Sequence, residues 1–200
     1  MKTILLLICF LGVIRFSQAQ KLLTVLDNYN PLKNATSVNR HKVWDDFTDE
    51  IPLKNRMVVP GFTWHWGGYN FDTLFIGQGR MMAEKNGVLI NIGTFEDLCD
   101  RGIGSDTSLS PISYKICRRW GRRILKIEWE NVGYFEDWSY RGICDRHLHF
   151  QMWLFEKDSR VEIHCPRELW FREATTALRQ AEVRILLPEG QKVFALTRSQ

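Results

Sequence analysis

Hydrophobic and polar residues alternate along the stretch from Arg123 to His164. It reads RRILKIEWENV, then a loop, then HLHFQMWLFEKDSRVEIH. Successive side chains of a strand point to opposite faces of its sheet, so an alternation of period two predicts strands with one buried and one wet side. We therefore expect three strands here, the last two joined as a hairpin with its turn at 156–159.

The three predicted strands share an apolar face, which we expect to form one wall of the core. It consists of Leu125, Ile127, Trp129, Leu148, Phe150, Met152, Leu154, Val161 and Ile163. Burial of such side chains is worth roughly 1.5–3 kcal/mol each before the entropy cost. The opposite face, which we expect to meet solvent, carries Lys126, Glu128, Glu130, His147, His149, Gln151, Trp153, Glu162 and His164.

Further short strands are predicted at 57–62, 69–76, 87–92 and 112–117, with turn residues between them. The clearest turn is Asn86-Gly87, because both residues tolerate a positive φ and Asn-Gly is a strong hairpin signal. Short strands punctuated by turns, with little helical periodicity, predict an all-β fold. The expected architecture is an antiparallel β-sandwich, jelly-roll-like in character.

The two ends of the chain have weaker patterns. A first strand is expected at 22–26, a short C-terminal helix at 168–183, and a hairpin from strands at 184–187 and 192–196. The expected organisation is a signal peptide at 1–19, a lead-in at 20–55, a β-sandwich core at 56–166 and a tail at 167–200. The tail either completes the sandwich or is a truncated end.

An export signal is indicated by Lys2, the apolar run at 4–14, and the small residues Ser17 and Ala19 before Gln20. The run is too short to cross a bilayer, so we expect no integral membrane segment once the signal is removed. Loss of Lys2 and Arg15 lowers Lys+Arg from 27 to 25 against 23 Asp+Glu. This near-neutral charge gives no support for nucleic-acid binding. The expected location is the periplasm, the cell surface or the extracellular space.

Four cysteines remain after the predicted cleavage: Cys99, Cys117, Cys144 and Cys165. In an exported chain they permit two disulfides with three alternative pairings, and isolated buried thiols are the other reading. No CxxC motif is present, so the spacing does not support a zinc ribbon or a thioredoxin-like redox site.

The ordered segments SPISYKI, GRRILKIEWENVGYFED and FQMWLFEKDSRVEIH resemble a β-sandwich module of exported proteins from Bacteroidetes-type bacteria. GFTWHWGGYNFDTLFIGQGR and INIGTFEDLCDRG are similar to the opening strands of that module, so the likeness covers roughly 51–164. The module often precedes a type IX secretion sorting domain. The resemblance implies a role at the cell envelope without catalysis. Cys165-Pro166 replaces the aromatic-Gly pair of the module, and after Pro166 the resemblance ends.

A metal site is one hypothesis for the polar face. His147 and His149 project from the same side of one predicted strand, and His164 from the next, where the register places it near Gln151. An HxH pair with a third histidine binds Zn²⁺ in some enzymes and leaves a position for water. The alternative function is therefore a metal-dependent hydrolase, with Glu128 or Glu162 as base or supporting partner. Solvent-facing histidines without a metal are the ordinary reading.

Ligand binding is the other hypothesis for this face, with Trp153, His149, Gln151 and Glu162 as candidate residues. A flat ring beside polar groups can stack on a sugar or contact a partner protein. Trp64, Trp66 and Trp138 lie in turn-rich segments and are further candidates. The sequence thus favours an exported, non-catalytic binding, adhesive or structural module without a cofactor. The expected partner is a glycan or a cell-surface protein.

Overall fold

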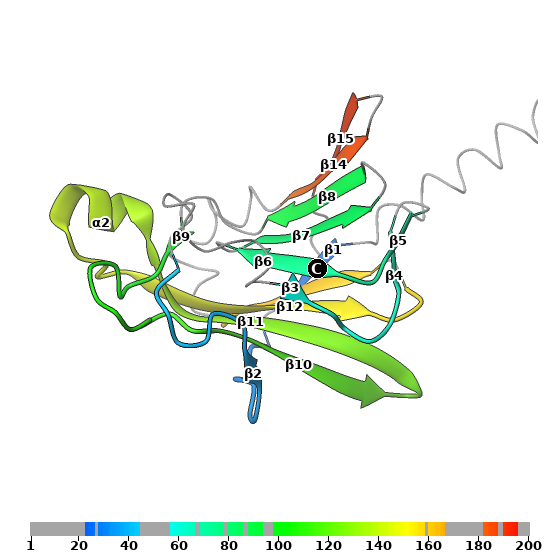
Figure 1. The fold of residues 1–200 in the computed structure, drawn as a ribbon, viewed down its shortest axis with the longest axis horizontal. Coiled ribbons are helices and arrows are strands. Elements are labelled where there is room, and N and C mark those ends of the chain that lie inside the picture. Colours follow the sequence, from blue (N-terminus) through cyan, green and yellow to red (C-terminus); the bar gives the residue numbers. More distant parts are fainter. Residues whose placement is uncertain are drawn as a thin grey trace, which may run out of the picture.

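The computed structural model describes residues 23–26, 28–44, 57–66, 69–77, 80–85, 88–93, 98–158, 160–166, 182–187 and 190–195. The regular secondary structure in this part of the chain consists of strands and one short helix, α2 (Phe135–Arg141). Two main sheets, both mostly antiparallel, face each other (Figure 1). The expected all-β, antiparallel sandwich is confirmed.

The first sheet has the order β1-β13-β12-β11-β10-β2, and β9 also pairs with β11. Its strands are β1 (Leu23–Leu26), β2 (Thr36–Ser37), β9 (Leu98–Cys99), β10 (Ile112–Arg119), β11 (Arg122–Tyr134), β12 (His147–Phe155) and β13 (Val161–His164). The three strands expected between Arg123 and His164 are thus β11, β12 and β13. The register pairs Gln151 with His164, as the alternation predicted.

The second sheet has the order β15-β14-β8-β7-β6-β3. Its strands are β3 (Met57–Val58), β6 (Leu74–Gly77), β7 (Arg80–Lys85), β8 (Val88–Gly93), β14 (Glu182–Leu187) and β15 (Gly190–Ala195). A separate two-stranded sheet contains β4 (Trp64–Trp66) and β5 (Tyr69–Phe71). Of the strand predicted at 57–62 only β3 forms, and the strand predicted at 69–76 is divided into β5 and β6.

The tail supplies a hairpin, because β14 and β15 pair with each other and β14 also pairs with β8. The predicted C-terminal helix at 168–183 lies largely outside the described residues, and its last two positions belong to β14. At the other end, β1 pairs with β13 in parallel. Within the described residues, no helix is long and apolar enough to span a membrane.

A β-bulge in β11 changes which residues of that strand face the core. Between the pairs Trp129–Phe150 and Val132–Leu148, β11 contains one residue more than β12. The extra residue lies at Asn131, whose φ of 55° is one that asparagine tolerates better than most residues. As a result Val132 is buried and Asn131 is left at the outer side of the strand.

The core fills the space between the two sheets, and one side chain ties them together. Every residue predicted for the apolar wall is buried. Trp129 stacks on Phe150 with ring centroids 4.8 Å apart. Its indole Nε1 donates a 2.9 Å hydrogen bond to the carbonyl of Gly77, in β6 of the opposite sheet. This bond satisfies two polar groups that would otherwise be buried without a partner.

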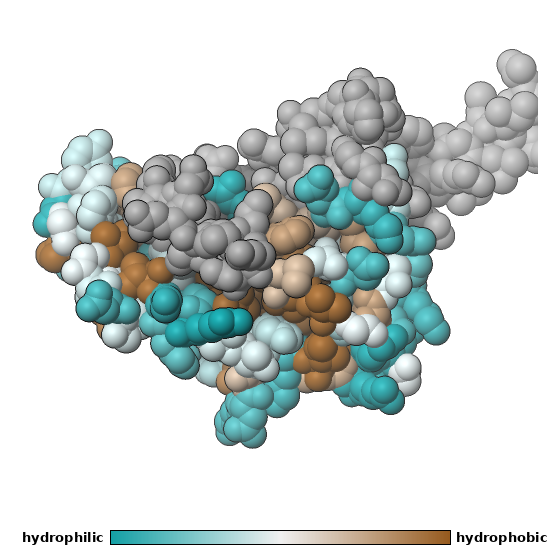
Figure 2. Space-filling view, in the orientation of Figure 1, coloured by the Kyte–Doolittle hydropathy of each residue, from teal (hydrophilic) through white to brown (hydrophobic). Residues whose placement is uncertain are grey.

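The edge of the sandwich formed by β3 and β10 is more open than its centre. Hydrophobic residues reach the surface there, between two hydrophilic regions (Figure 2). The exposed large apolar side chains on or beside these strands include Met57, Val59 and Ile116. Ile116 belongs to the apolar face of β10, and it is uncovered because this strand lies near the end of its sheet.

We expect Trp129→Phe to lower the free energy of unfolding by about 1–3 kcal/mol. The substitution leaves the Gly77 carbonyl without its donor and creates a small cavity. Urea denaturation measures the change. Trp120→Phe is the matched control, because Trp120 is 87% exposed and should change stability by less than about 0.5 kcal/mol. Equal stabilities of the two variants would contradict this role for Trp129.

Candidate functional site

The outer face of the first sheet is covered by the segment that follows β1. We call residues 28–33 the covering segment. It is held by hydrogen bonds to the face that the sequence predicted to be wet. The Tyr29 hydroxyl donates to Oε1 of Glu128 at 2.9 Å, and the backbone N–H of Leu32 donates to the same atom at 3.1 Å. Nε2 of Gln151 donates to the carbonyl of Asn30 at 2.6 Å.

This cover corrects the expectation of a solvent-exposed face for three of its residues, whereas Glu130 and His147 are exposed as predicted. Glu128, Gln151 and His164 are only 2%, 0% and 1% exposed. The alternation correctly predicted which residues share this face. It could not predict that a segment about 100 residues earlier in the chain would pack over them. Because buried polar groups need partners, this face became a network of hydrogen bonds.

The register aligns the polar side chains of neighbouring strands in two rows across the sheet, here called ranks. One rank is Glu162, Trp153, Lys126 and Lys115, and the next is His164, Gln151, Glu128 and Ser113. Within the second rank, Nε2 of Gln151 donates to Glu128 at 2.8 Å. The two ranks are joined by Trp153, whose Nε1 donates to Oε1 of Gln151 at 2.9 Å. These residues therefore position one another.

Glu128 is the centre of the network. Its carboxylate accepts hydrogen bonds from Tyr29, Leu32 and Gln151. Burial and the adjacent Glu128 carboxylate both raise the pKa of the Tyr29 phenol above its usual value. The phenol consequently remains a proton donor throughout the neutral range, which the hydrogen bond to Glu128 requires.

Trp153 does not present an open ring for stacking. The imidazole of His164 stacks on it with ring centroids 3.7 Å apart, and the ammonium of Lys126 lies 3.4 Å from its ring centroid. Two groups this close cannot share one face of the ring, so they occupy opposite faces. The ring is therefore engaged within the protein, and the stacking of a sugar on Trp153 stays a prediction. Trp64 and Trp66, also considered as exposed platforms, are buried.

The other predicted ligand-binding residues are also engaged within the protein. His149 accepts a hydrogen bond at Nδ1 from the backbone N–H of Asn131 at 3.0 Å. Burial lowers the pKa of His149, and the neighbouring His147 adds to this effect. Glu162 contacts His164 at 3.0 Å and Arg160 at 3.5 Å. Together with the buried Gln151, these residues form a supporting layer under the covering segment.

The three candidate zinc ligands are not brought together. His147 and His149 meet edge to face with ring centroids 5.6 Å apart. His164 instead bonds Glu162 through Nε2 and Asn28 through Nδ1 at 2.5 Å. Within the part of the chain that the structure describes, no group of three His, Cys, Asp or Glu side chains is arranged to hold a metal ion. The geometry therefore gives the hydrolase hypothesis no support.

A pocket lies between the covering segment and the strands β10, β11 and β12. Its volume is about 600 Å³. The lining residues are Asn28, Tyr29, Asn30, Pro31, Leu32, Lys33, Lys115, Cys117, Lys126 and Trp153. Sequence reasoning missed this site, although the alternation of β10 and β11 already placed Lys115, Cys117 and Lys126 on one face.

The pocket is cationic. Lys33, Lys115 and Lys126 line it, and in the described part of the chain none of these ammonium groups has a carboxylate partner. Lys115 donates from Nζ to the carbonyl of Lys33 at 2.6 Å. The pKa of Lys126 is lowered, mainly by burial; Arg119 and Lys115 also lower it, while Cys117 and Glu162 act in the opposite direction. The carboxylates of Glu128 and Glu162, on the same face of the sheet, already hold other partners.

Comparison with models of known families, with curated proteins and with solved structures found no match in any of the three searches.

We expect Tyr29→Phe to cost about 1.5–3 kcal/mol of stability near neutral pH, because Glu128 loses a hydrogen bond to a buried charge. Tyr140→Phe, at an 82% exposed position, is the control and should have no effect. The raised pKa of Tyr29 means that its stabilisation is fully present below about pH 10, the unfolded value, and is lost above it. Urea denaturation between pH 7 and 11 should therefore show the gap between wild type and Tyr29→Phe narrowing at the alkaline end. A difference in the free energy of unfolding that stays constant with pH would contradict this role for the Tyr29 hydroxyl.

Proposed function

We propose that this chain is an exported, non-catalytic binding module of the bacterial cell envelope, and that it binds an acidic ligand in the lysine-lined pocket. The observation that carries the proposal is the convergence of Lys33, Lys115 and Lys126 on one cavity without a carboxylate partner in the described residues. Export is supported by the N-terminal apolar run and the small residues that follow it.

The placement of the lysines favours a ligand over a purely structural role. Lys115 and Lys126 are directly opposite each other on neighbouring strands. Like charges in this arrangement are destabilising, by roughly 0.2–1 kcal/mol. Lys126 is moreover half-buried, which disfavours its charged form. An anion bound between the two ammonium groups would offset both costs.

The size and lining of the pocket favour a small acidic glycan or a similar polyhydroxylated anion. A volume of about 600 Å³ falls within the usual range for small-molecule sites. The lysines would bind carboxylate or sulfate groups, since a lysine ammonium contributes three donors. Asn28 and Asn30 supply amide and carbonyl groups for hydroxyls, and Pro31 supplies an apolar surface. The ligand would contact the pocket through charge and hydrogen bonds more than through stacking on Trp153.

The arrangement of the carboxylates supports a function without catalysis. A glycosidase needs two carboxyl groups on either side of a bound sugar. Here Glu128 is saturated by hydrogen bonds from Tyr29, Leu32 and Gln151, and Glu162 is paired with His164 and Arg160. Both groups stabilise the protein, and neither lines the pocket.

We expect the double variant Lys115→Gln/Lys126→Gln to bind acidic oligosaccharides at least about tenfold more weakly than the wild type. Each lost contact between an ammonium and an anion is worth about 1 kcal/mol or more. The measurement is calorimetry on ligands selected from an array of carboxylated, sulfated and neutral oligosaccharides. Lys157→Gln is the matched control, because Lys157 is exposed on the turn after β12, away from the pocket.

Affinity for the selected ligands should also fall as salt is raised from 0.05 to 0.5 M, since counterions screen the lysines. Tight binding of neutral oligosaccharides that is indifferent to both salt and the double substitution would refute the proposal. So would an array without any bound acidic ligand.

Cys117 gives an independent measure of occupancy, because it lines the pocket and is half-exposed. Its alkylation by iodoacetamide should be slowed several-fold by a bound acidic oligosaccharide, and unchanged by a neutral one. The tryptic peptide 116–118 contains this cysteine alone and allows the reaction to be followed by mass spectrometry. Alkylation at the same rate with saturating acidic ligand would place the ligand elsewhere.

A further inference from the structure

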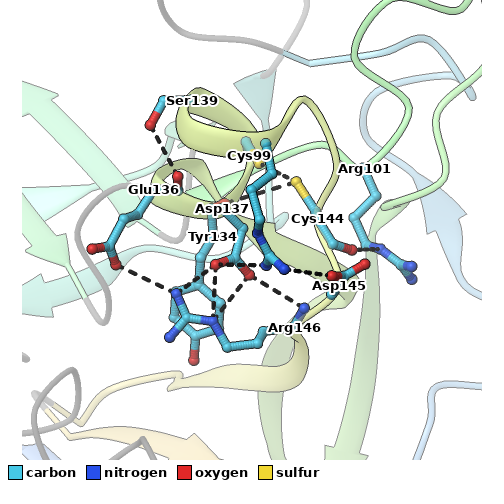
Figure 3. Close-up of polar contacts among 10 residues, drawn as sticks. Cys99, Arg101, Tyr134, Glu136, Asp137, Ser139, Cys144, Asp145 and Arg146 are labelled. Carbon is cyan, nitrogen blue, oxygen red and sulfur yellow. Dashed lines mark hydrogen bonds and ion pairs between the residues drawn. The ribbon is translucent and has the colours of Figure 1, made fainter.

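Two cysteines that are distant in the sequence meet beside α2. The Sγ atoms of Cys99 and Cys144 are 3.2 Å apart, and both residues are buried. Cys99 ends β9, which pairs with β11 through the register Gly133–Cys99. Cys144 lies in the return from α2 to β12. Figure 3 shows the two sulfur atoms side by side beneath the helix.

Gly133 provides the space for this contact. A Cβ on residue 133 would lie 2.7 Å from Cβ and 2.8 Å from Sγ of Cys144, closer than real contacts allow. Cys144 thus occupies the place of the missing side chain at 133. Since Cys99 is directly opposite Gly133 in the neighbouring strand, the thiol of Cys144 comes to lie against the thiol of Cys99.

The backbone around Cys144 is fixed from several directions. Nε of Arg101 donates to the carbonyl of Cys144 at 3.1 Å. Two residues later, Arg146 donates to Asp137 of α2 through Nε at 3.0 Å and Nη2 at 2.6 Å. Figure 3 shows these contacts on either side of the sulfur pair. The cysteines are therefore held together by bonds that do not involve sulfur.

We propose that Cys99 and Cys144 form a disulfide once the chain reaches an oxidising compartment. The two thiols lose two protons and two electrons to a disulfide of a small molecule or of an oxidoreductase, which is reduced to two thiols. The sulfur atoms need to approach by roughly 1 Å, to the bond length of about 2.05 Å. The link is independent of the proposed ligand, since neither cysteine lines the pocket.

The disulfide would close a loop that contains β10, β11 and α2. These elements include the strand that carries Lys115 and the strand that carries Lys126 and Trp129. Closing so long a loop restricts the unfolded chain and thereby stabilises the folded state. The expected gain in the midpoint of thermal unfolding is roughly 5–15 °C for a chain of this size.

Peptide mapping tests the pairing directly. Trypsin places the four cysteines on separate peptides, 86–101, 116–118, 142–146 and 161–167. The full-length protein, exported to the periplasm or equilibrated with oxidised and reduced glutathione, is blocked with iodoacetamide and digested without reductant. We expect peptide 86–101 linked to 142–146, and released by reductant. Recovery of both peptides as alkylated thiols, or linked to other partners, would overturn the proposal.

Thermal unfolding supplies the second measurement. Cys99→Ser and Cys144→Ser should each lower the midpoint of the oxidised protein by roughly 5–15 °C, and reductant should lower the wild type to a similar degree. Cys117→Ser is the matched control and should leave the midpoint and its sensitivity to reductant unchanged. A wild-type midpoint that is indifferent to reductant would count against the link. Peptide mapping needs no variant, so the proposal stays testable if a serine variant fails to fold.

Discussion

The buried carboxylate of Glu128 is the constraint on which the outer half of this protein depends. A charge taken out of water is costly unless it is paired or hydrogen-bonded. Among the described residues Glu128 forms no ion pair, and its carboxylate accepts hydrogen bonds from Tyr29, Leu32 and Gln151. Two of these donors come from the covering segment, so its position over the sheet follows from the need to satisfy this carboxylate.

The same requirement shapes the pocket. Because residues 28–33 are held over Glu128, they form one wall of the pocket, and β10, β11 and β12 form the other. The neighbouring rank, which contains Trp153, then positions Lys126. His164 supports one face of Trp153 and Lys126 lies on the opposite face, so this ammonium has a defined position. A network that stabilises the fold thus also orients the groups proposed to bind an anion.

The two sheets are joined in a different way, through apolar contact and one hydrogen bond. Trp129 lies in the same strand as Glu128 and points to the other side, where it reaches Gly77 of the second sheet. One strand therefore organises both layers of the molecule, with odd-numbered positions in the core and even-numbered positions in the polar network. Beyond Trp129 the bulge at Asn131 shifts this parity by one residue, so that the even-numbered Val132 faces the core.

The sequence alone determined the fold class, the strands from β10 to β13 and their two faces. Alternation is a local property of the chain, and it predicted the pairing of Gln151 with His164 because hairpin register depends on nearby residues. The C-terminal hairpin was predicted for the same reason.

Only the tertiary structure decided what covers each face, since the covering segment lies about 100 residues from Glu128 and its contact leaves no periodic signal. Glu128, Gln151 and His164, predicted on a solvent-exposed face, are buried, and Trp153 lies against Lys126. His164 contacts Glu162 and Asn28, while His147 and His149 contact each other. The meeting of Cys99 with Cys144 likewise depends on a long-range strand pair and on the absence of a side chain at Gly133.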